Sequence, residues 1–273
     1  MNQHGSTERA VLKARAKELM KTVRPAAWLM VLVYMAATNL VSGIVESGIA
    51  ANTNIELLSY YASQGDTYMV GSLIRELFAS PGGYLAIFLS IAVTLYTTVV
   101  DYGYVSYSMR VVRNKQAGYG ELFSRFYMAG KIILSLVLEV VFVSLWSMLF
   151  IIPGIIAAYR YRMVIYLLLD DPDCPVLEAF QRSKLLMMGR KMELFQLDFS
   201  FFGWLLLAAL LIDLPVTLLG MTPGANLLSN VIMVAFNLFL VPYQQFTFTG
   251  WYEAIRPREV GQTSDYEIEN SSF

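Results

Sequence analysis

Histidine and cysteine are nearly absent from this chain, which has only His4 and Cys174 among its 273 residues. A single cysteine excludes an intramolecular disulfide, and one residue of each type cannot build a Cys/His zinc site. No histidine lies near Cys174 in the sequence, so a catalytic thiol pair is not indicated. No catalytic or nucleotide-binding motif stands out either. We therefore expect no metal, no cofactor and no enzyme activity.

Charge is also scarce, since charged residues make up 15% of the chain and hydrophobic residues 56%. Soluble domains typically have about 25% and about 45–50% of these classes. The net charge of −1 argues against a nucleic-acid-binding surface. What the sequence has instead is long apolar runs, which favour membrane-spanning helices. Six such runs are expected to span at residues 25–45, 84–109, 132–152, 155–169, 192–212 and 225–249.

The loops between these runs alternate in positive charge. Their Lys and Arg counts, from the N-terminus, are 6, 1, 5, 0, 4, 0 and 2. Basic loops stay on the cytoplasmic side of a membrane. This pattern supports a crossing by the short fourth run, because the basic loop after it would otherwise lie outside. The sequence thus predicts an all-α, polytopic protein with six transmembrane helices and both termini in the cytoplasm, in the bacterial cell membrane.

The chain divides into a segment 1–24, a membrane domain 25–250 and a polar tail 251–273. Residues 6–24 form a basic amphipathic helix, which suits the headgroup layer of an anionic inner leaflet. A solvated helix before the first span is the alternative. Anionic lipids are therefore the expected partners, and no protein partner is indicated.

Two local signals describe the second half of the membrane domain. Pro153-Gly154 predicts a tight turn that joins the third and fourth spans as a hairpin. The acidic residues from Asp170 to Asp173 predict the start of a cytoplasmic helix of about 15 residues between spans four and five. Glu178 and Arg182 are expected to form an ion pair within it.

Charged side chains within the spans are the candidate functional residues. Each costs roughly 2.5–3.5 kcal/mol to insert. At about 1.5 Å per residue they lie about 10–13 Å from the inner surface. We expect a shared network in which Glu139 and Asp198 stabilise Arg162 or Arg160, with Glu139 and Arg162 at matching levels. Three interpretations stay open: an ion-pair network that fixes helix packing, a proton or ion pathway, and capture of an anionic lipid headgroup. The cluster comprises Asp101, Glu139, Arg160, Arg162 and Asp198.

A series of short motifs lies between Ile152 and Trp204. They read IPGII, LDDPD, LEAFQRSK, MGRK and LFQLDFSFFGW, and they are flanked by RAKEL at 15–19, VPY at 241–243 and WYE at 251–253. This series resembles a bacterial family of integral membrane proteins labelled domain of unknown function 975. The resemblance implies a multi-helix membrane protein, with no established activity or catalytic residues.

Function is therefore weighed from the spans and their charges alone. The sequence favours a non-enzymatic structural, regulatory or assembly role. The alternative is a small membrane transporter that uses the charged cluster in the inner half of the bilayer. A lipid-acting enzyme is the weakest hypothesis, because no His, Cys or paired-Asp motif lies at a cytoplasmic mouth.

Overall fold

The computed structural model describes residues 3–53, 55–220 and 222–256. Every regular element in these ranges is helical, which confirms the all-α class. Of the polar tail expected at 251–273, residues 257–273 lie outside the described part of the chain. The helices are α1 (Gln3–Thr22), α2 (Ala27–Asn52), α3 (Ile55–Ser63), α4 (Thr67–Leu77), α5 (Pro81–Val112), η1 (Tyr119–Leu122), η2 (Phe126–Met128), α6 (Ala129–Leu149), α7 (Ile151–Tyr161), α8 (Val164–Asp170), α9 (Val176–Leu186), α10 (Lys191–Phe199), α11 (Phe202–Leu219) and α12 (Pro223–Ile255).

Six helical segments in the described part of the chain are long and apolar enough to cross a membrane. They coincide with the six apolar runs of the sequence, and the chain is therefore a multi-pass membrane protein. The last helix continues to Ile255, a few residues beyond the expected end of the membrane domain. The segments are Ala27–Ala50, Pro81–Val112, Tyr119–Leu149, Ile151–Asp170, Lys191–Leu219 and Pro223–Ile255.

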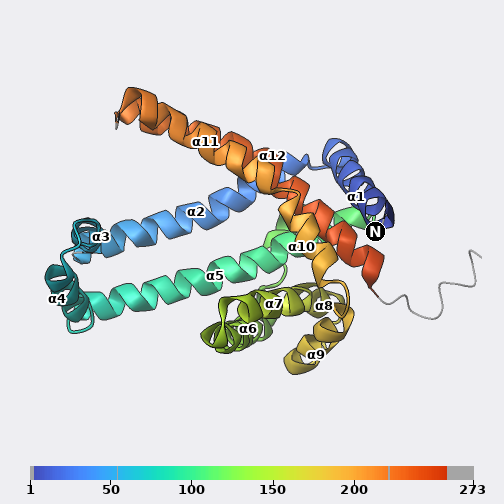
Figure 1. Cartoon of the computed structure of the whole chain (residues 1–273), viewed down its shortest axis with the longest axis horizontal. Coiled ribbons are helices and arrows are strands. Elements are labelled where there is room, and N and C mark those ends of the chain that lie inside the picture. Colours follow the sequence, from blue (N-terminus) through green and yellow to red (C-terminus); the bar gives the residue numbers. More distant parts are fainter. Residues whose placement is uncertain (1–2, 54, 221, 257–273) are drawn as a thin grey trace, which may run out of the picture.

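The spans pack as helical hairpins that diverge from a common end (Figure 1). The hairpins are α2 with α5, α6 with α7, and α11 with α12. We call the end where α1, α8, α9 and the C-terminus of α12 gather the closed end. The opposite end, where α3 and α4 connect α2 to α5, is the open end. In α5 the buried residues concentrate from Val99 onward, so the protein core lies toward the closed end.

Local capping explains where the two longest spans begin. The Ser80 hydroxyl accepts a hydrogen bond from the Gly83 N–H at 3.0 Å, and Pro81 opens α5. Thr222 caps α12 in the same way, with Pro223 as its first residue. A hydroxyl at the cap satisfies a backbone donor that has no partner in the helix, and proline at the first position loses no hydrogen bond.

The hairpin of α6 and α7 turns earlier than the sequence suggested. The chain is extended at Phe150, with φ −161° and ψ 153°. The prediction that Pro153-Gly154 forms the connection between the two helices is wrong. Both residues lie in the first helical turn of α7, where proline is tolerated. Gly154 serves packing instead: a Cβ there would lie 2.1 Å from the Ser147 Oγ on α6.

The fourth and fifth spans are each interrupted by a two-residue turn that keeps right-handed helical backbone angles. The fourth ends its first helix at Tyr161 and resumes at Val164. The fifth ends at Phe199 and resumes at Phe202.

The helix between spans four and five is shorter than expected, with 11 residues from Val176 to Leu186. Asp170 instead ends α8. Pro172 and Pro175 disfavour helical backbone in the residues that precede them, which keeps the intervening segment irregular. The expected Glu178–Arg182 pair is present, at 2.7 Å.

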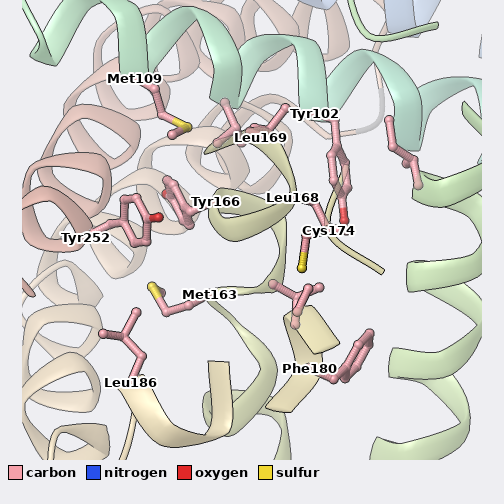
Figure 2. Close-up of a cluster of buried hydrophobic side chains, with 14 of the residues drawn as sticks. Tyr102, Met109, Met163, Tyr166, Leu168, Leu169, Cys174, Phe180, Leu186 and Tyr252 are labelled. Atoms are coloured by element: carbon pink, nitrogen blue, oxygen red, sulfur yellow. The ribbon is translucent and has the colours of Figure 1, made fainter. Parts of the chain in front are cut away.

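The closed-end core joins α5, α8, α9 and α12. Leu168 and Met187 are fully buried in it. Figure 2 shows Tyr166 and Tyr252 side by side at one edge of this cluster, with ring centroids 4.7 Å apart. Stacking of α8 on α12 at this point fixes the second half of the fourth span against the last span.

Helix α1 lies against the bundle. Its Ala16 is buried, and Leu19 packs against the core formed with α2, α5 and α12. The Lys13 Nζ donates to the Ser200 carbonyl at 3.2 Å, beside the break in the fifth span. Burial, and then the neighbouring cations Lys17 and Arg9, lower the pKa of Lys13. The apolar stripe expected to enter the headgroup layer therefore contacts protein, which leaves the opposite, basic face exposed.

Candidate functional site

A cavity of about 490 Å³ lies among α5, α6, α7 and the start of α8. Three of the five charged residues singled out in the sequence line it, together with tyrosine rings and small or aliphatic side chains. Its volume falls within the range of small-molecule sites, about 300–1,000 Å³. The lining residues are Thr98, Asp101, Tyr102, Leu136, Glu139, Ala158, Tyr159, Tyr161, Arg162 and Ile165.

Arg162 forms a two-contact ion pair across the cavity wall. Its guanidinium donates to the two carboxylate oxygens of Asp198 at 3.0 and 3.2 Å. The Tyr159 hydroxyl donates to the same carboxylate at 2.8 Å. Arg162 lies at the break of the fourth span, and Asp198 lies two residues before the break of the fifth. The pair therefore ties the two broken spans together, and the sequence prediction of an Asp198–Arg pair agrees with this geometry.

Asp101 has a neutral partner. It accepts a hydrogen bond from the Tyr34 hydroxyl on α2 at 2.6 Å. The Tyr34 ring in turn stacks on Tyr104, with centroids 4.9 Å apart. Asp101 forms no ion pair among the described residues.

Glu139 makes neither a hydrogen bond nor an ion pair with any described residue. The expected direct pair with Arg162 is therefore not formed, because the Arg162 fork is already occupied by Asp198. Glu139 remains in the wall of the cavity that Arg162 also lines.

Arg160 does not join this group. Its guanidinium lies 5.8 Å from the Trp146 ring centroid, and its backbone carbonyl accepts a hydrogen bond from Ser183. Side chains two residues apart on a helix point in different directions, which is why Arg160 and Arg162 separate. The structure thus brings together four of the five charged residues and leaves Arg160 outside.

A second charged group, which the sequence analysis missed, lies at the closed end. Arg113 contacts Asp170 and Glu253, each at 2.6 Å. Arg256 pairs with Glu253 at 3.1 Å, and the Tyr252 hydroxyl donates to Asp170 at 2.6 Å. Burial lowers the pKa of Arg113, but the hydrogen bonds and charges of Glu253 and Asp170 outweigh it and raise the pKa overall. This network joins the ends of α5, α8 and α12.

The closed-end network could have been found only in part from the sequence. Asp170 and Glu253 belong to the LDDPD and WYE motifs. Their shared partner Arg113 stands among other basic residues of a loop, where nothing distinguishes it. Only the packing of α5 between α8 and α12 brings the three side chains together.

A polar layer separates this network from the cavity. The Gln245 amide donates to Ser108 at 3.2 Å and to Tyr166 at 3.3 Å. Ser108 and Thr249 also share a hydrogen bond at 2.8 Å. Gln245 on α12 thereby forms hydrogen bonds to both α5 and α8.

No curated protein and no solved structure matches the chain. One family model matches its second half. The model of a family described as "Protein of unknown function (DUF975)" matches residues 148–259. The matched segment includes Arg162, Asp198 and Glu253, whereas Asp101 and Glu139 precede it. The match confirms, over residues 148–259, the family that the sequence motifs indicated.

Proposed function

We propose that the protein is a small, non-enzymatic membrane carrier that binds a solute in the cavity among α5, α6 and α7. The observation that carries this proposal is a cavity of about 490 Å³ whose wall holds Asp101, Glu139 and Arg162 within apolar spans. Ionisable residues in a membrane are expensive, and they typically mark substrate or ion pathways.

The interruptions of the fourth and fifth spans support the same proposal. Transporters often form their sites at discontinuous spans. Here the breaks of the fourth and fifth spans meet through the Arg162–Asp198 pair, and Arg162 itself lines the cavity. A purely structural ion pair would need no cavity beside it.

Filling the cavity tests the proposal. Ala158 lines the cavity, so Ala158→Phe should occupy the space that a solute needs. Ala36 is exposed on α2 away from this cavity, and Ala36→Phe is the matched control. We expect uptake of labelled solutes into proteoliposomes to be lost in the first variant and retained in the control. If the wild-type protein moves no cationic, anionic or neutral solute, a structural, regulatory or assembly role remains.

We further propose that the closed end faces the cytoplasm of the cell, with both termini inside. The alternating loop charge supports this orientation. Cys174 is only 3% exposed and is a poor reporter of its side. Exposed positions serve better: in a Cys174→Ser background, Ser63→Cys should react with an impermeant thiol reagent on intact cells, and Lys115→Cys should not. The reverse pattern would invert the orientation.

Anionic lipids of the inner leaflet are the proposed partners of α1. Its exposed face carries Lys17 and Lys21, and Arg24 follows the helix. Each basic residue near an anionic surface contributes about 1 kcal/mol of attraction. Removing all three charges should reduce copurification of anionic lipid with the protein. Unchanged lipid content would show that this face meets water alone.

A further inference from the structure

We propose that the cavity selects a small organic cation of the quaternary ammonium class. This inference rests on the proposed function, and it adds the chemical class of the solute. It follows from the charge left over in the cavity wall, from the ring lining and from the cavity volume.

Charge is the first step. The wall contains one cation, Arg162, and that cation is paired through two contacts with Asp198 behind it. Among the described residues neither Asp101 nor Glu139 contacts a cation directly, although the charge of Arg162 acts on Glu139 without a contact. A carboxyl group inside a bilayer must be either protonated or paired with a positive charge. A solute that brings the positive charge would satisfy both groups.

The same pairing argues against an anionic solute or lipid phosphate. Two nitrogens of the Arg162 guanidinium already donate hydrogen bonds to a carboxylate. Arg160 is directed to the Trp146 ring and does not line the cavity. An anion would therefore meet two carboxylates and no available cation.

Volume and lining then favour an organic cation over a bare metal ion. A site of about 490 Å³ is far larger than a metal ion, and among the described residues no group of three or more His, Cys, Asp or Glu side chains could hold one. Tyr102, Tyr159 and Tyr161 are among the residues that line the wall. Aromatic faces attract quaternary ammonium groups, whose methyl surface also fits an apolar wall.

The test compares two probes of the same shape, with acetate as a third, anionic probe. Choline carries the positive charge, and 3,3-dimethylbutan-1-ol is its neutral carbon counterpart. Binding to the purified full-length protein in detergent is followed by thermal stabilisation, with total chloride held constant by exchange against sodium chloride. We expect choline to bind, the alcohol to bind at least about tenfold more weakly, and Glu139→Gln to weaken choline binding by about tenfold or more. Glu46→Gln, an exposed carboxylate on α2, is the matched control and should bind as the wild type does.

Each outcome decides a different part of the proposal. Preference for the alcohol or for acetate, abolished by Ala158→Phe, would overturn the cation class and leave a solute-binding cavity in place. Choline binding unchanged in both Glu139→Gln and Asp101→Asn would overturn the site. Failure of every probe to bind, together with absence of uptake by the wild type, would overturn the proposed function as well. Glu139→Asp keeps the negative charge and should retain more choline binding than Glu139→Gln. This comparison distinguishes loss of the charge from misfolding as the cause of weaker binding.

Discussion

The ion pair between Arg162 and Asp198 should stabilise the fold by a measurable coupling energy. Its two contacts of 3.0 and 3.2 Å join the broken fourth and fifth spans. The side chains are 40% and 24% exposed. Breaking a buried pair costs about 3–5 kcal/mol, whereas exposed pairs contribute about 0–1 kcal/mol. The partial exposure and the two-contact geometry place the coupling at about 2 kcal/mol.

A double-mutant cycle measures this coupling. Arg162→Gln and Asp198→Asn should each lower the thermal unfolding midpoint by roughly 4–8 °C, at about 2–4 °C per kcal/mol for a domain of this size. The double variant should lose less than the sum of the two. Unfolding in detergent is followed by tryptophan fluorescence at one fixed scan rate, so that irreversible loss affects all four proteins alike. The matched cycle of Arg162→Gln with Glu139→Gln should show weaker coupling, because these two side chains share the cavity without a direct contact. Additive losses in the Asp198 cycle, or stronger coupling in the Glu139 cycle than in the Asp198 cycle, would refute the assigned pairing.

Three further predictions follow from the closed end. Gly103→Ala should destabilise the fold by roughly 1–3 kcal/mol, since its Cβ would lie 2.1 Å from the Leu122 carbonyl oxygen, and chemical denaturation would show a lower midpoint. Burial raises the pKa of the Cys174 thiol, so less reactive thiolate is present at neutral pH, and modification should be slow in the folded protein, faster at alkaline pH, and fastest after unfolding. Arg113→Gln should lower the unfolding midpoint more than removal of the exposed Lys115 charge by Lys115→Gln, because it leaves Asp170 and Glu253 beside one another; equal midpoints would show that the network contributes nothing to stability.

Much of the architecture follows from sequence pattern. Apolar runs of about 20 residues have few alternatives to membrane helices, and the proline and hydroxyl signals at Ser80 and Thr222 set helix starts locally. The turn at Phe150 was not predictable in this way. Proline is compatible both with a turn and with the first turn of a helix, and the close packing of Gly154 on Ser147 favours the second.

The candidate site was predictable in its members and less so in its pairing. Counting residues from the membrane surface predicts one common depth for four of the charged residues, because the rise per residue of a helix is nearly constant. These residues are Asp101, Glu139, Arg162 and Asp198. Which carboxylate meets Arg162 depends on the rotation of each helix and on the breaks, and sequence periodicity does not give these. The helix break at Arg162 lets its fork reach Asp198 on α10 and leaves Glu139 facing the cavity.

The most direct test of the central claim is chemical labelling of Glu139 by dicyclohexylcarbodiimide, an apolar reagent that reacts with protonated carboxyl groups in membranes. Modified sites are located by mass spectrometry of the protein in proteoliposomes, with and without choline. If the cavity holds a cation against Glu139, the side chain should be labelled in the absence of choline and protected in its presence, while labelling of the exposed Glu46 should not change with choline. Labelling of Glu139 that is indifferent to choline would contradict a cation-binding cavity at this position.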